Sequence, residues 1–135
     1  MSSPVVYVID DDDACRKALG LLLPAMGVAA QTFRSAREFL EQLSPNSMGC
    51  VVADMRMPEM SGVELVGQLR VVDPDLPVIL VSGDLGAASA DKAAELGAVA
   101  VLSKPFDVGQ LKESLDVAFE LLKGRRSAAV RHVET

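Results

Sequence analysis

Polar side chains stand at the ends of several short apolar runs in this sequence, where they could form one chemical site. They are Asp10, Asp11, Asp12 and Asp13 after run 5–9, Asp54 after run 50–53, Ser82 after run 78–81, and Ser103 and Lys104 after run 99–102. If the runs are parallel strands, their carboxyl ends open on one crevice, and these side chains converge there.

Three carboxylates held close together repel one another unless a cation neutralises them or one takes up a proton. Oxygen ligands with room for water suit Mg²⁺, which commonly binds one or two carboxylates together with a phosphate. A pocket that adds the ammonium of Lys104 and the hydroxyl of Ser82 can hold the three oxygens of a phosphoryl group. Asp54 is then the expected in-line nucleophile.

Each of these motifs has a simpler explanation when taken alone. A run of acids after a strand usually forms a solvated turn and a helix cap, which would be the whole role of Asp12 and Asp13. A single Asp at a strand end, or a Lys-Pro pair, is commonly turn chemistry. The occurrence of all of them at matching strand ends favours the phosphoryl site.

Five β-branched runs alternate with helical patterns, which predicts a parallel sheet. The runs are Val5–Ile9, Ala29–Phe33, 50–53, 78–81 and 99–102. The first, third and fourth are apolar throughout, as central strands are, whereas the second carries Gln31 and Thr32 and suits an edge. We predict an α/β, flavodoxin-like doubly wound fold, with a five-stranded sheet of order 2-1-3-4-5 and five helices.

Apolar residues at helical spacing mark the five helices. The stripes are Cys15, Ala18 or Leu19, Leu22 and Met26; Ala36, Leu40 and Leu43; Leu65, Leu69 and Val72; Ala90, Ala94 and Gly97; and Leu111, Leu115, Ala118 and Leu122. Gly27 is the expected left-handed cap of the first helix, and Pro24 should bend that helix without ending it. From Gly124 the pattern lapses, so residues 1–123 are the expected domain and 124–135 a tail or the start of a linker.

Composition limits the classes of function. Of the 135 residues, 50% are hydrophobic and 24% charged, which is typical of one globular domain. The net charge of −6 argues against a nucleic-acid surface. The chain shows neither an apolar run of membrane-spanning length nor a signal peptide, so we expect a cytoplasmic protein without membrane contact.

The cysteines and the histidine carry no metal or redox pattern. Cys15 and Cys50 are far apart in apolar surroundings, which indicates buried free thiols. His132 stands alone in the polar tail, which indicates an ordinary surface residue.

Four segments together resemble the receiver domains of bacterial two-component response regulators: VYVIDDDDACRK, VVADMRMPEMSGVEL, VILVSG and VLSKPF. The similarity extends from about Val5 to Leu122. The stretch ADMRMPEMSGVEL is similar to receivers of the FixJ type, which usually precede a DNA-binding helix-turn-helix domain.

The resemblance implies a role for each matching residue. Asp54 would be phosphorylated, Asp11 would bind Mg²⁺ directly, Asp10 would act largely through water, and the backbone carbonyl of Arg56 would complete the protein's share of the coordination. Ser82 would contact the phosphoryl group and Lys104 would pair with it, before a cis peptide bond at Pro105. Pro58 and Gly62 match the loop and helix start that follow the phosphorylation site.

One position departs from the family. Receivers commonly carry Tyr or Phe three residues before the lysine, as the aromatic half of a conformational switch, and this sequence has Val101 there. A second expectation concerns Arg56 and Asp84, each two positions beyond a site residue, which could form a salt bridge that slows loss of the phosphoryl group.

The function that this resemblance implies is a signalling switch that is not an enzyme in the usual sense. A histidine kinase would donate the phosphoryl group, phosphorylation would favour a homodimer through the fourth and fifth helices and fifth strand, and DNA would be bound only by an output domain outside this chain. Two alternatives are an aspartyl-phosphate phosphatase and a flavodoxin-like cofactor module. The first usually has an Asp where Arg56 stands, and the second a glycine-rich loop where the aspartates stand.

Overall fold

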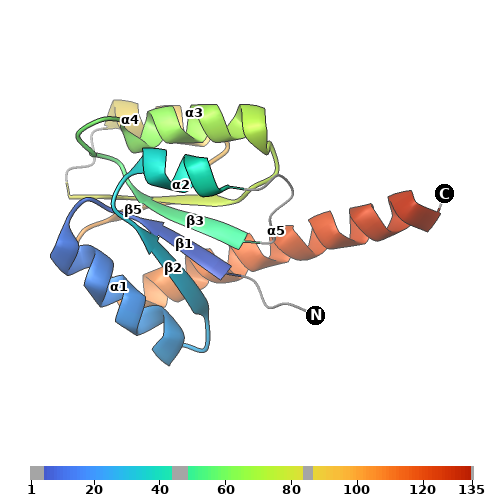
Figure 1. Ribbon diagram of the computed structural model, residues 1–135, viewed down its shortest axis with the longest axis horizontal. Helices are drawn as coiled ribbons and strands as arrows, with labels where there is room; N and C mark the ends of the chain where they lie inside the picture. Colours follow the sequence, from blue (N-terminus) through green and yellow to red (C-terminus); the bar gives the residue numbers. More distant parts are fainter. Residues whose placement is uncertain (1–4, 44–48, 84–86, 135) are drawn as a thin grey trace.

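One parallel sheet forms the centre of the molecule. The computed structural model describes residues 5–43, 49–83 and 87–134, with backbone alone for 87–90 and 125–134. Within these residues the strands are β1 (Val5–Ile9), β2 (Ala29–Phe33), β3 (Gly49–Asp54), β4 (Val78–Ser82) and β5 (Ala100–Ser103). Their order is β2-β1-β3-β4-β5, which confirms the predicted order (Figure 1). β2 is at an edge, as its polar residues indicated.

Helices cover both faces of the sheet. They are α1 (Asp13–Ala25), α2 (Ala36–Gln42), α3 (Gly62–Val72), α4 (Ala87–Glu95) and α5 (Val108–Glu134). Figure 1 shows α1 and α5 on one face and α2, α3 and α4 on the other. Each face has its own apolar core: Leu19, Leu23, Leu111 and Leu115 are buried on the first, and Phe33, Phe39, Leu65 and Leu69 on the second.

The central strands are covered from both sides. Every residue of β3 except Asp54 is buried, and so is every residue of β4. Because close-packed interiors resist deformation, the carboxyl ends of these strands are well-fixed positions for functional side chains.

The end of α1 follows the sequence expectation. The helix includes Pro24 and continues to Ala25. Gly27 then adopts φ +83°, its N–H donates to the carbonyl of Pro24, and the N–H of Val28 donates to the carbonyl of Leu23. Because this pair of bonds needs a left-handed residue, glycine is the favourable choice at position 27.

Helix α5 continues past the expected end of the regular pattern at Gly124. It runs to Glu134, and its C-terminal part extends away from the sheet (Figure 1). Among the α5 residues whose side chains are described, Leu122 is the last buried one, and Lys123 and Gly124 after it are exposed. The helix therefore continues past the point where the apolar pattern lapses, and the division of the chain at residue 123 stays a prediction. No helix in the described ranges is long and apolar enough to cross a membrane.

Candidate functional site

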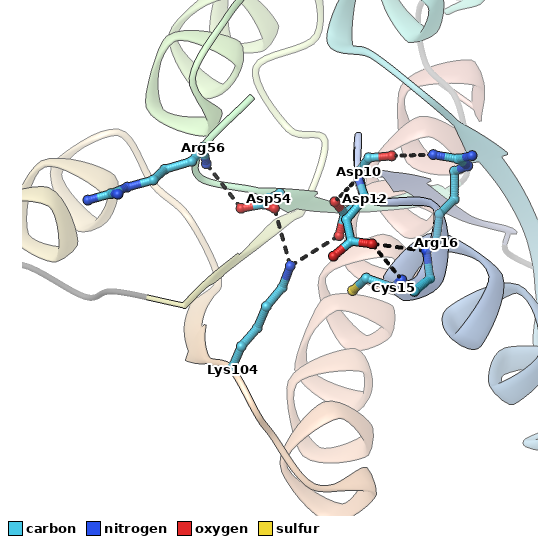
Figure 2. A network of polar contacts seen from close by, with 8 residues as sticks. Asp10, Asp12, Cys15, Arg16, Asp54, Arg56 and Lys104 are labelled. Atoms are coloured by element: carbon cyan, nitrogen blue, oxygen red, sulfur yellow. Dashed lines mark hydrogen bonds and ion pairs between the residues drawn. The ribbon is translucent and has the colours of Figure 1, made fainter. Parts of the chain in front are cut away.

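Three predicted site residues meet at the carboxyl edge of the sheet. Asp10 directly follows β1, Asp54 is the last residue of β3, and Lys104 directly follows β5. The ammonium nitrogen of Lys104 lies 3.2 Å from Oδ2 of Asp10 and 3.2 Å from Oδ2 of Asp54 (Figure 2). The strand ends therefore bring together two carboxylates and one ammonium, as the sequence pattern predicted.

The loop after Asp54 is held by the backbone of its neighbours. The N–H of Arg56 donates to Oδ1 of Asp54 at 3.0 Å, and the N–H of Gly62 donates to the carbonyl of Met55 at 2.9 Å. A Cβ on Gly62 would lie 2.8 Å from the carbonyl oxygen of Asp54. Since real Cβ atoms do not come so close, position 62 needs glycine for α3 to begin against the end of β3.

The acidic residues fit a hard divalent cation. Asp10, Asp11 and Asp54 each offer a carboxylate oxygen within 4.8 Å of the others. Asp10 is buried, Asp54 is half-buried and Asp11 is exposed. All ligands are oxygens and one side is open to water, which is the environment that Mg²⁺ prefers. The predicted contribution of the Arg56 carbonyl stays a prediction.

Electrostatics at the site favour additional positive charge. Burial raises the pKa of Asp54, and the negative charge of Asp10 adds to this effect, although the Arg56 N–H and Lys104 oppose it. Burial lowers the pKa of Lys104, but the carboxylates of Asp10 and Asp54 outweigh burial and hold that pKa above its ordinary value. Lys104 is therefore an ammonium at neutral pH, and its single charge does not neutralise the carboxylates.

Ser82 ends β4 beside this cluster. It is buried, it pairs in register with Ser103, and its carbonyl accepts a hydrogen bond of 2.7 Å from the N–H of Lys104. The Lys104–Pro105 peptide bond is cis, as the family resemblance implied. Asp84, the expected partner of Arg56, lies outside the described residues.

The four consecutive aspartates divide into two roles. Asp10 and Asp11 belong to the carboxylate cluster. Asp12 is the N-cap of α1, and its Oδ1 accepts from the N–H groups of Ala14 at 2.9 Å and Cys15 at 3.4 Å. The expectation that Asp12 caps the helix is confirmed.

Two neighbours of the site were not recognised from the sequence. Arg16 is buried, and its guanidinium donates to the carbonyl of Asp10 at 2.8 Å and pairs with the carboxylate of Asp13. The spacing of Asp13 and Arg16 was the available signal for this pair. Cys50 is buried as predicted, but Cys15 is only half-buried and lines the same small recess as Asp10 and Asp54.

Comparison with known proteins identifies the class. Residues 6–116 match the family described as the response regulator receiver domain. The chain belongs to this family, and so it is a receiver domain of a two-component system. Five parallel strands of order 2-1-3-4-5 with five helices are the fold of its structural neighbours.

The similar proteins are regulators of bacterial transcription and signalling. The chain is 37% identical to the response regulator protein TodT of Pseudomonas putida, over 94% of this chain and 56% of that protein. It is 38% identical to the transcriptional regulatory protein FixJ of Bradyrhizobium diazoefficiens, over 84% of this chain and 55% of that protein. Among solved structures, the response regulator StyR superposes with a TM-score of 0.91 at 34% identity, over 98% of this chain and 67% of that one. The structure of FixJ-N superposes with a TM-score of 0.77 at 33% identity, over 89% of this chain and 96% of that one.

The chain spans about half the length of the curated relatives it matches. The similarity therefore concerns their receiver part, and the activities of the whole regulators are not carried over with it.

Proposed function

We propose that this receiver accepts a phosphoryl group on Asp54 in a Mg²⁺-dependent reaction and thereby switches an output. The main support is the position of Asp54, whose carboxylate pairs with the ammonium of Lys104 and has an oxygen within 4.8 Å of carboxylate oxygens of Asp10 and Asp11. Asp54 is a half-buried residue at the end of a rigid central strand, so an incoming group can reach it while the carboxylate stays oriented.

The residues around Asp54 would divide the work of the transfer. An oxygen of Asp54 attacks the phosphorus, the phosphorus–nitrogen bond of a phosphohistidine breaks, and the electron pair leaves with the imidazole. Lys104 and the hydroxyl of Ser82 would contact the phosphoryl oxygens, while the Arg56 N–H orients the carboxylate. Asp11, Asp54 and the Arg56 carbonyl would hold Mg²⁺ directly and Asp10 largely through water, and the ion would neutralise charge on the transferred group.

A cognate histidine kinase is the proposed phosphoryl donor, and control of transcription is the proposed output. The relatives include a protein named as the transcriptional regulatory protein FixJ. DNA would be bound by an output domain, because the net charge of −6 leaves this chain poorly suited to phosphate backbones. Turnover as a phosphatase is not favoured, since Arg56 stands where that class carries a second acid.

Phosphorylation is proposed to favour a homodimer through the face formed by α4, β5 and α5. Val108, Val117 and Leu121 on α5 are large apolar residues exposed by about half. Burial of such side chains against a second copy would contribute favourable free energy to association.

Intact-mass measurement after incubation with Mg²⁺ and acetyl phosphate tests the proposal. Wild-type protein should gain the mass of one phosphoryl group, and Asp54→Asn should gain nothing, because an amide is not the nucleophile. Asp75→Asn, at an exposed position outside the site, is the matched control and should label like wild type. A mass gain in Asp54→Asn would contradict the assignment.

The proposed metal ligands are tested separately by Mg²⁺ titration. Asp11→Ala should lose more affinity than Asp10→Ala, because only Asp11 is expected to bind the ion directly. Equal losses would contradict this division of roles.

A further inference from the structure

Arg16 is a buried cation in a place where helix electrostatics does not favour one. It lies in the first turn of α1, where the positive end of the helix dipole repels cations. Its side chain is only 10% exposed, so the guanidinium has lost most of its contact with water. A buried charge is costly unless hydrogen bonds compensate it, and the partners of Arg16 therefore indicate why it is there.

Those partners lie on either side of the turn between β1 and α1, which carries Asp11 of the acidic cluster. One guanidinium nitrogen of Arg16 donates to the carbonyl of Asp10 at 2.8 Å (Figure 2). The other terminal nitrogen pairs with the carboxylate of Asp13. Side chains on a helix point toward its N-terminus, which is how a residue of α1 reaches back to the end of β1. The planar fork of arginine holds both acceptors at once.

The carbonyl of Asp10 and the amide of Asp11 belong to one planar peptide group, so a bond that holds the carbonyl also orients Asp11. On the other side, Oδ1 of Asp10 accepts from the N–H of Asp12 at 2.9 Å. These two hydrogen bonds fix the Asp10–Asp11 segment from two directions. Among the described contacts, the side chain of Arg16 is the only one that binds the backbone carbonyl of Asp10.

We propose that Arg16 is a positioning residue for the cation site, because it fixes the Asp10–Asp11 peptide and thereby keeps both carboxylates within reach of one divalent ion. The inference rests on the proposed Mg²⁺-dependent function. The direction in which Mg²⁺ affinity changes when Arg16 is replaced distinguishes positioning from simple charge repulsion. A cation beside a metal site repels the metal, so removal of its charge alone would strengthen Mg²⁺ binding, whereas loss of its positioning would weaken it.

Calorimetric titration of the unphosphorylated protein with Mg²⁺ alone separates these two effects. Arg16→Lys keeps the charge, but one ammonium cannot hold both acceptors as the fork does, and Arg16→Met also removes the charge. Both variants should bind Mg²⁺ about tenfold more weakly, the effect typical of losing a residue that orients a metal ligand. Lys17→Met, which removes an exposed neighbouring cation, is the matched control and should stay within about twofold of wild type.

A second measurement needs no metal. In Arg16→Lys the amide of Asp12 should exchange hydrogen faster than in wild type, while the urea midpoint of the whole domain changes little. Wild-type affinity in Arg16→Lys, or tighter binding in Arg16→Met, would overturn the inference. Should Arg16→Met fail to fold, Arg16→Lys decides the question. Wild-type protein that binds no Mg²⁺ would contradict the proposed function itself.

Discussion

The ammonium of Lys104 lies 3.2 Å from a carboxylate oxygen of Asp54, although 50 residues separate them in the chain. The same nitrogen is 3.2 Å from Asp10, so one cation holds two carboxylates that would otherwise repel each other. This arrangement couples the stability of the domain to the charges at the proposed phosphoryl site.

Lys104→Met should therefore destabilise the Mg²⁺-free domain by about 1–3 kcal/mol at pH 7, because two carboxylates lose a partly buried partner. The difference from wild type should shrink as the pH falls and the carboxylates take up protons, since neutral acids no longer need the ammonium. Urea unfolding at a series of pH values measures both effects. Lys123→Met is the control, because its ion pair with Glu120 is exposed and should contribute at most about 1 kcal/mol. Equal losses in the two variants would contradict a special role for Lys104.

The same substitution at two glycines of α3 should have opposite effects. Gly62→Ala should destabilise the domain by about 1–3 kcal/mol, because the new methyl group would meet the Asp54 carbonyl and the Cα of Met55, at 2.8 and 2.9 Å. Gly67 has open space around its Cβ direction, so Gly67→Ala should stabilise the helix by up to about 1 kcal/mol. Urea midpoints of the two variants test the prediction, and a stabilised Gly62→Ala would show that α3 can move away from β3.

The two thiols should react slowly with a disulfide reagent at pH 8 in the native protein. Burial raises the pKa of Cys50 to about 12, and burial together with Asp10 raises the pKa of Cys15 to about 11. The attacking species is the thiolate, which is scarce at pH 8 for both groups. Cys15 should react first because it is half-buried and Cys50 is buried. Both should react rapidly in concentrated urea, and fast native labelling of Cys50 would contradict its burial.

These raised pKa values also set the direction of a pH effect on stability. Unfolded thiols lose their protons near their ordinary pKa, whereas the folded ones keep them to higher pH. The contribution of the two protonated thiols to the free energy of unfolding is therefore complete below the pKa of the unfolded thiols. It is lost as the pH rises through the pKa values of the folded thiols.

Leu121→Glu should keep the phosphorylated protein monomeric, because it places a charge on the exposed apolar surface of α5 where the dimer is proposed to form. Leu21→Glu, at a leucine of α1 that is 78% exposed, is the matched control and should dimerise like wild type. Sedimentation of the phosphorylated variants measures the association constant. Phosphorylated wild type that stays monomeric at high concentration would argue against the dimer.

Val101→Tyr should also change the association constant of the phosphorylated protein. Val101 is half-buried on β5 and packs against the core beneath α3 and α4, where the family commonly has an aromatic residue. A larger side chain there would alter how the state of Asp54 reaches the α4, β5 and α5 face. An unchanged constant would indicate that the signal takes another route.

Much of this molecule could be predicted from local sequence patterns. The apolar runs predicted the strands, Gln31 and Thr32 in the run Ala29–Phe33 predicted the edge strand, and Gly27 predicted the end of α1. These predictions succeed because side-chain periodicity and backbone preference act over a few residues. The site residues Asp10, Asp54 and Lys104 could be predicted as well, since the ends of parallel strands meet at one edge whatever the sequence distance between them.

Hydrogen bonds from arginine side chains to distant backbone carbonyls could not be predicted, because no sequence pattern marks the carbonyl that folding brings near a given arginine. Arg70 donates to the carbonyls of Leu76 and Leu96, at 2.9 Å each, and so ties the end of α3 to the segment before β5. Arg16 likewise contacts the carbonyl of Asp10, and α5 remains helical beyond Gly124, where the apolar pattern of the sequence lapses. A carbonyl is present in every residue, so its position in the tertiary structure, rather than the sequence around it, decides which guanidinium it meets.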